Sequence, residues 1–192
     1  MNRIEPRHLI FPIICFFSLN LAFITFKNSF SINNRMLTDS KDESIHPSRI
    51  SDFFPSSIRK WEQYIIQASE QYSFDPDLIA SVMLQESGGN PGAFSVSGAV
   101  GLMQVMPSDG PAAAFQCKNG SCFSDRPTIE DLINPEFNVH FGAALLSEYV
   151  SKYGSTREGL KNYGPMDVGY RYADTVIEIY EKSKLQKHIT EY

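Results

Sequence analysis

The sequence predicts a mainly α-helical domain over residues 57–192, preceded by an apolar segment and a polar stretch. Apolar residues recur at three- and four-residue spacing in several segments, which is typical of amphipathic helices. Gly, Pro and Ser gather between residues 90 and 110, so irregular loops are expected in one region of the domain. With 192 residues, of which 42% are hydrophobic, the chain has room for one folded domain and a tail.

Residues 1–27 are expected to form a membrane signal. Arg3 and Arg7 precede an apolar run over residues 9–26, which as a helix would be about 27 Å long, close to the hydrocarbon thickness of a bilayer. No small-x-small cleavage site follows the run, so an uncleaved anchor is preferred over a cleaved signal peptide. The positive residues before the run place the remainder outside the cytoplasmic membrane. A lipid-modified Cys15 is the competing interpretation, but the residues before it are not small.

Residues 28–56 are rich in Ser, Asn and Asp and lack sustained apolar periodicity, which predicts a flexible linker. Helical patterns follow. The second begins at Asp75-Pro76, an N-cap residue and a proline in the first helical position, and ends before Gly88. The expected helical segments are residues 57–72, 75–87, 128–133, 134–154, 157–163 and a last helix around 172–180.

Charge and cysteine content limit the partners. The formal net charge is −5, and no concentrated basic face is visible, which argues against a nucleic-acid-binding protein. Cys117 and Cys122 flank a segment whose Asn119-Gly120 pair favours a tight turn, so an extracytoplasmic disulfide is expected. Two free thiols or half of a metal site are the alternatives, although no second Cys or His pair completes such a site. A monomeric domain is the default expectation.

Glu86 is the residue whose position first suggests chemistry. On a helical wheel it lies about 20° from Ile79 and about 40° from Val82, so it shares their apolar face. Burial and the negative end of the helix dipole both raise the pKa of a carboxyl group placed there. A carboxylic acid that is protonated near neutral pH is suited to general-acid catalysis on a glycosidic oxygen. A frayed helix end with Glu86 facing water is the alternative.

The residues around Glu86 form a long motif. It reads Gln85-Glu86-Ser87-Gly88-Gly89-Asn90-Pro91 and then Ser95-Val96-Ser97-Gly98-Ala99-Val100-Gly101-Leu102-Met103-Gln104-Val105-Met106-Pro107. This motif strongly resembles the soluble lytic transglycosylase family, and the similarity continues through Asn134-Pro135-Glu136-Phe137-Asn138 and Gly164-Pro165. The resemblance covers residues 57–192. It implies a goose-lysozyme-like α-helical fold, with irregular loops around a groove for the N-acetylglucosamine and N-acetylmuramic acid units of peptidoglycan.

The resemblance also assigns roles to individual residues. It makes Glu86 the catalytic glutamate. Ser95 matches a serine that helps to orient the N-acetyl group of the reacting muramic acid, with a turn-forming serine as the alternative. Gln104 and Met106 match positions on the groove floor, although Met106 is also suited to plain core packing. Ser87 is interpreted as structural support for the acid.

One departure from the family concerns a tyrosine near the acid. The family commonly has Tyr-Asn-Ala-Gly-Pro, whereas this chain has Lys161-Asn162-Tyr163-Gly164-Pro165. Strict alignment places Lys161 at the tyrosine position. A two-residue shortening lets Tyr163 take that role, and Tyr163 is the preferred candidate for a phenol that contacts Glu86 or the substrate.

The missing second carboxylate decides between mechanisms. Goose-type lysozymes tend to place an aspartate directly after Gly-Leu-Met-Gln-Val, and here that position is Met106. The resemblance then implies that Glu86 acts as acid and afterwards as base, without metal or cofactor, and that the product is a 1,6-anhydromuramyl end. A hydrolytic goose-type lysozyme that uses Asp109 or Asp125 stays open, as does a non-catalytic cell-wall glycan-binding module. The expected location is the cell envelope, at the outer face of the cytoplasmic membrane, or outside the cell if residues 1–27 are cleaved.

Overall fold

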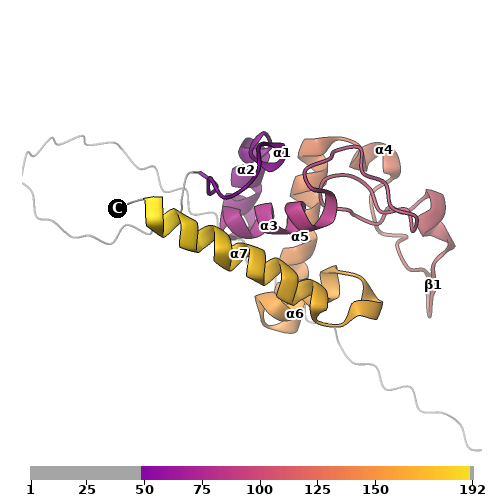
Figure 1. Ribbon diagram of the computed structural model, residues 1–192. Coiled ribbons are helices and arrows are strands. Elements are labelled where there is room, and N and C mark those ends of the chain that lie inside the picture. Colours follow the sequence, from indigo (N-terminus) through magenta and orange to yellow (C-terminus); the bar gives the residue numbers. More distant parts are fainter. Residues whose placement is uncertain (1–48, 191–192) are drawn as a thin grey trace, which may run out of the picture. The chain divides into compact units, whose positions relative to one another are not determined.

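The computed structural model describes residues 49–190, with side chains as far as residue 187 (Figure 1). The mainly α-helical class is confirmed. The elements in chain order are α1 (Ser56–Arg59), α2 (Glu62–Tyr72), α3 (Pro76–Ser87), η1 (Gly110–Ala114), β1 (Gln116–Cys117), β2 (Gly120–Ser121), α4 (Ile129–Leu132), α5 (Pro135–Tyr153), α6 (Thr156–Tyr163), η2 (Met166–Val168) and α7 (Arg171–Thr190). The predicted anchor over residues 1–27 lies outside the described residues, and within residues 49–190 no helix is long and apolar enough to cross a bilayer.

Local sequence signals set the ends of the two central helices as expected. At the start of α3, the Asp75 carboxylate accepts a hydrogen bond from the backbone N–H of Asp77, and Gly88 ends the helix in the left-handed conformation. At the start of α5, the Asn134 side chain accepts a hydrogen bond from the N–H of Phe137, and the left-handed Gly154 follows the last turn. These ends are stabilised by residues within one turn, which is why the sequence predicts them well.

The helix predicted over residues 57–72 is wrong in one respect, because the chain breaks between α1 and α2. Trp61 has φ −99° and ψ 7°, outside the helical region, and its indole N–H donates to the carbonyl oxygen of Gly89 at 3.0 Å. Ile58 and Ile65, on either side of the break, are both fully buried. Apolar spacing alone does not show the interruption because both short helices face the same core.

The linker predicted over residues 28–56 is wrong at its carboxyl-terminal end. Ile50 and Phe54 are 2% and 1% exposed and belong to the hydrophobic core. The backbone N–H of Ser51 donates to the buried carboxylate of Asp77 at 2.8 Å. Two apolar side chains spaced by four residues are too few to produce a periodic signal, so the sequence alone does not reveal this extension of the domain. The rest of the predicted linker, residues 28–48, lies outside the described residues.

The centre of the domain is α3, in which residues 76–83 are all buried. It packs against α7 and α2, and α5 packs against α2 and α6. In Figure 1, α7 runs along α3, with α6 near the amino-terminal end of α7. This packing leaves only the carboxyl-terminal turn of α3, which carries Glu86, at the edge of the core.

A loop over residues 90–107 follows α3 and is fastened to α5 by one buried amide. The Asn138 side chain accepts a hydrogen bond from the N–H of Met103 at 2.8 Å and donates to the carbonyl oxygens of Val100 and Leu132 at 2.9 and 3.0 Å. A Cβ atom at position 101 would lie 2.4 Å from the Asn138 amide nitrogen, and Gly101 has φ +79°. Both facts require glycine there, and the Asn138 hydrogen bonds fix the Gly-Leu-Met-Gln segment, residues 101–104, against α5.

The core position of Phe54 leads to a test of the domain boundary. We expect Phe54→Ala to lower the free energy of unfolding by about 3–5 kcal/mol, because it leaves a cavity in the core. Leu185→Ala is the control, since Leu185 is 64% exposed, and its effect should stay below about 0.5 kcal/mol. Urea unfolding followed by circular dichroism measures both values. Equal effects of the two substitutions would place Phe54 outside the folded domain.

Candidate active site

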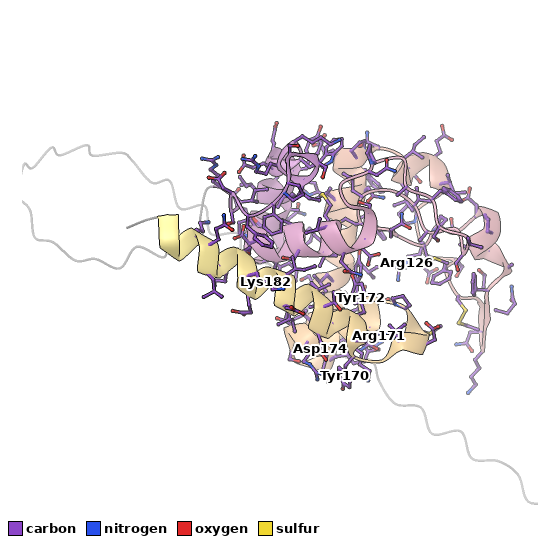
Figure 2. All side chains as sticks on the ribbon, in the orientation of Figure 1. Arg126, Tyr170, Arg171, Tyr172, Asp174 and Lys182 are labelled. Carbon is purple, nitrogen blue, oxygen red and sulfur yellow. A yellow bond between two sulfur atoms is a disulfide. The ribbon has the colours of Figure 1, made fainter. Side chains whose placement is uncertain are left out.

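Glu86 lies in the last turn of α3, half-buried between α7 and the loop after α3. The hydroxyl of Tyr172, at the start of α7, donates a hydrogen bond to Glu86 Oε1 at 2.5 Å. Figure 2 shows Tyr172 on the part of α7 that runs beside α3. The carboxyl group is therefore fixed by a helix that begins 84 residues after α3 ends, counting from Ser87 to Arg171.

The surroundings of Glu86 raise its pKa to about 7 from an ordinary value of 4.5. Burial is the larger cause, and the hydrogen bond from Tyr172 opposes it by stabilising the carboxylate. Burial, followed by the charge of Glu86, raises the pKa of Tyr172 well above its usual value, so the phenol keeps its proton and acts as the donor. Near neutral pH the Glu86 carboxyl group can thus release a proton and take one back.

Ser87 supports the end of α3 directly after the acid. Its hydroxyl lies 2.8 Å from the carbonyl oxygen of Leu102 and 3.3 Å from that of Met83, within donating distance of both. The same oxygen accepts a hydrogen bond from the N–H of Gly89. This agrees with the supporting role expected for Ser87, because it joins α3 to the Gly-Leu-Met-Gln segment.

Glycine at position 164 makes room for the Tyr172 ring. A Cβ atom there would lie 2.4 Å from the ring carbons of Tyr172. The Gly164-Pro165 pair of the sequence motif therefore has a steric purpose, which is to let Tyr172 pack closely enough to reach Glu86. A side chain at position 164 would displace the ring or the segment after α6.

Tyr163, the preferred candidate for the phenol near the acid, is close to Glu86 but is hydrogen-bonded elsewhere. Its hydroxyl donates to the carbonyl oxygen of Met103 at 2.8 Å. Its pKa is raised well above the usual value, mainly by burial and then by the charge of Glu86, with the positive charge of Arg126 acting in the opposite direction. Lys161 points elsewhere, with its ammonium nitrogen 4.4 Å from the centre of the Tyr170 ring.

Tyr172, which contacts the acid, was not among the site residues predicted from the sequence. In the sequence it stands at the start of the last predicted helix, around residues 172–180. A buried phenol needs a hydrogen-bond partner, and that requirement is the one signal that marks Tyr172. It does not identify Glu86 as the partner.

The other predicted substrate-binding residues lie on the loop after α3. The Ser95 hydroxyl accepts a hydrogen bond from the N–H of Ala99 at 2.8 Å, as in a serine-stabilised turn. Gln104 has φ +45° and donates from its amide to the carbonyl oxygens of Ala93 and Gly101. Met106 is half-buried. In the structure, the polar side chains of Ser95 and Gln104 thus hold the loop in shape.

The structure also describes the two cysteines and the two aspartates for which the sequence left alternative roles open. Cys117 and Cys122 form the expected disulfide, which closes the hairpin of β1 and β2. Residues 49–187 contain no group of three or more His, Cys, Asp or Glu side chains able to hold a metal ion. Asp109, an alternative for positioning water, accepts a hydrogen bond from the N–H of Ile129 at the start of α4. Asp125 is exposed and lies 3.4 Å from the hydroxyl of Ser124. No other carboxylate of the described residues acts on the pKa of Glu86.

Comparison with known proteins places this site in a family. The family model described as the transglycosylase SLT domain matches residues 63–170, which is more than half of the chain. The matched range includes Glu86, the loop after it and α5, and it ends two residues before Tyr172.

Several curated proteins are similar to this chain. A membrane-bound lytic murein transglycosylase E from Buchnera aphidicola is 34% identical over 69% of this chain and 55% of its own length. A transglycosylase from Enterobacteria phage PRD1 is 35% identical over 56% of this chain and 36% of its own length. An endo-type membrane-bound lytic murein transglycosylase A from Klebsiella pneumoniae is 39% identical over 46% of this chain and 42% of its own length. The matches span between about a third and just over half of these relatives.

A solved structure is also similar, that of an inactive mutant of the lytic transglycosylase Slt from Pseudomonas aeruginosa. It has 22% sequence identity and a TM-score of 0.43 over 62% of this chain and 20% of that protein.

The raised pKa of Glu86 leads to a test of the site by stability. The folded state holds the proton more tightly than the unfolded state, so stability is lost as pH rises from about 4.5 to 7. Glu86→Gln removes this loss. We compare the free energy of unfolding of the variant with that of the parent at each pH. This difference should be about 2 kcal/mol more in favour of the variant at pH 8 than at pH 5.

Thermal or urea unfolding at the two pH values measures that difference. Glu70→Gln, which removes an exposed carboxylate from α2, controls for the loss of one negative charge. A Glu86→Gln effect that is the same at pH 5 and pH 8 would mean that the carboxyl group is well solvated.

Proposed function

This chain belongs to the transglycosylase SLT domain family, and we propose that it is a lytic transglycosylase that cleaves the glycan strand of peptidoglycan. The bond broken is the β-1,4 link between N-acetylmuramic acid and N-acetylglucosamine. The observation that carries this proposal is the solitary Glu86, which is desolvated, has a pKa of about 7 and has no second carboxylate acting on it among the described residues.

The chemistry needs one group that transfers a proton twice, first as a general acid and then as a general base. Protonated Glu86 gives its proton to the glycosidic oxygen as the bond from that oxygen to C1 of muramic acid breaks, and N-acetylglucosamine leaves with a free hydroxyl group. The muramic N-acetyl group stabilises the positive charge that develops at C1. The carboxylate of Glu86 then takes the proton of the C6 hydroxyl as the C6 oxygen bonds to C1. A 1,6-anhydro ring results, and no water is consumed.

Tyr172 is suited to support both steps. Because it donates to Oε1, the second oxygen of Glu86 is left to exchange the proton with the substrate. The hydrogen bond stabilises the carboxylate between the two proton transfers and keeps the pKa from rising further. A phenol with a strongly raised pKa can do this without losing its own proton.

The substrate groove is proposed to be lysozyme-like and to include the loop after α3. Ser95, Gln104, Met106 and Tyr163 are the residues proposed to line it. The Gln104 side chain uses its amide nitrogen on the loop, and no hydrogen bond of the described residues uses its amide oxygen, which is therefore suited to accept from a sugar hydroxyl. Tyr163 is proposed to act by holding Met103, since its hydroxyl is bonded to that carbonyl oxygen.

The proposed location is the outer face of the cytoplasmic membrane, with residues 1–27 as a single-pass anchor. Two of the similar proteins are named as membrane-bound, which supports this placement. Peptidoglycan lies on that side of the membrane, and a disulfide such as Cys117–Cys122 persists in an oxidising compartment.

The test is to digest purified peptidoglycan with the protein and identify the muropeptide ends by mass spectrometry. We expect 1,6-anhydromuramyl ends from the parent protein and from the Glu70→Gln control. Glu86→Gln should lower the rate by at least about a hundredfold, because it removes the group that transfers the proton. Reducing ends would instead indicate a hydrolytic lysozyme, and undiminished cleavage by Glu86→Gln would exclude this residue as the acid.

A further inference from the structure

Arg126 is a half-buried cation in the segment between the disulfide hairpin and α4. One of its terminal guanidinium nitrogens donates to the hydroxyl of Tyr149 at 3.0 Å, and the guanidinium carbon lies 5.9 Å from the centre of the Phe141 ring. Its backbone N–H donates to the carbonyl oxygen of Phe123 at 3.0 Å. The guanidinium group is thus held by two residues of α5, and its own backbone is fixed by a turn.

No carboxylate neutralises Arg126 among the described residues. Arg49, Arg59 and Arg157 each have a carboxylate oxygen within 3.0 Å, whereas the partners of Arg126 are a neutral phenol and an aromatic ring. A half-buried guanidinium without an anionic partner is less stable than a paired one. Its planar fork of N–H donors matches a carboxylate particularly well.

The position of Arg126 relates it to the acid. The charges of Glu86 and Arg126 act on the same buried phenol, that of Tyr163, in opposite directions. Tyr149, which holds Arg126, also acts on that phenol. Phe141, whose ring lies under the guanidinium group, is followed on α5 by Gly142, and a Cβ atom at position 142 would lie 3.0 Å from the Tyr163 hydroxyl. Arg126 and Tyr163 therefore pack against neighbouring positions of α5, and Arg126 does not contact Glu86 (Figure 2).

The substrate offers a carboxylate close to the bond that is cleaved. In an intact glycan strand the sugars are neutral, because the lactyl group of muramic acid is joined to a peptide through an amide. The free carboxylates belong to that stem peptide, which is carried on the same ring whose C1 reacts. Two extended residues span at most about 7 Å, so a stem carboxylate lies near the bond being cleaved.

We propose that Arg126, positioned by Tyr149, binds a carboxylate of the stem peptide and makes this chain select peptide-bearing strands. The proposal rests on the proposed function and adds a specificity residue to it. Two exposed aromatic residues lie on α5 four residues before Phe141 and four residues after Tyr149, so aromatic side chains flank the guanidinium group on both sides. These are Phe137, stacked on Phe141, and Tyr153, beside Tyr149.

The test compares two forms of peptidoglycan, one native and one whose stem carboxylates have been converted to neutral amides with a carbodiimide and ammonia. Rates of anhydromuropeptide release are measured with the full chain. We expect the parent to cleave native material about tenfold faster than amidated material. Arg126→Gln should lose about tenfold on native material and less than twofold on amidated material.

Matched variants distinguish a loss of carboxylate binding from a folding defect and from the loss of any one positive charge. Lys182→Gln removes one positive charge from an exposed position about 15 Å along α7 from Tyr172 (Figure 2), and it should leave both rates unchanged. Tyr149→Phe removes the hydroxyl that holds Arg126 and should give a smaller loss, on native material alone. The melting temperature of each variant should match that of the parent.

The outcomes distinguish this proposal from the proposed function. An equal loss for Arg126→Gln on both materials would indicate a structural role, and no loss on either would remove Arg126 from recognition. Either result overturns the inference while the parent enzyme still releases anhydro ends. If the parent cleaves neither material, the proposed function itself is wrong.

Discussion

Tyr172 and Glu86 are 86 residues apart in the chain, and the hydrogen bond between them joins α7 to the end of α3. Several other features of the structure make that hydrogen bond possible. Gly164 leaves space for the Tyr172 ring, and Ser87 fastens the last turn of α3 to the loop. Burial of α3 from its first residue leaves Glu86 partly desolvated. Burial and the charge of Glu86 raise the pKa of Tyr172, so the phenol stays protonated. Burial raises the pKa of Glu86 to about 7, and the hydrogen bond from Tyr172 opposes this rise.

The same arrangement fits the proposed mechanism, in which one carboxylate makes both proton transfers. A hydrolytic site needs a second group to activate water, and the nearest alternative in the sequence, Asp109, is bonded to the start of α4. The groups shown to interact with Glu86 are instead the phenols of Tyr172 and Tyr163, and Tyr163 is bonded to the carbonyl oxygen of Met103. Asn138 and Gly101 fix the segment that contains Met103 against α5. Gly101 and Gln104 are therefore explained by the geometry of the loop, which Ser87 joins to the last turn of α3 directly after the acid.

Features set by nearby residues could be predicted from the sequence, and features set by distant packing could not. Asp75, Gly88 and Asn134 stabilise helix ends within one turn, and the Cys117–Cys122 disulfide spans a short hairpin. The sequence therefore predicts these helix ends and this disulfide. Glu86 was identified by its helix face and by the motif around it. The contact of Tyr172 with Glu86 depends on how α7 packs on α3, and the buried positions of Ile50 and Phe54 depend on contacts with distant helices. Periodicity carries no information on either contact. The sequence favours Tyr163 only because a two-residue shortening relative to the family motif lets it take the tyrosine position.

The proposed chemistry depends on a Glu86 carboxyl group that holds its proton near neutral pH. The most direct measurement is an NMR titration of the protein labelled with carbon-13 at the glutamate side-chain carboxyl carbon, with Glu86→Gln used to assign the signal. We expect a resonance that is absent from the variant and that titrates with a midpoint near pH 7. Tyr172→Phe should move that midpoint upward, because the hydrogen bond that stabilises the carboxylate is lost. A Glu86 midpoint between about pH 4 and 5, unchanged by Tyr172→Phe, would show that Glu86 is an ordinary solvated carboxylate and that Tyr172 does not act on it.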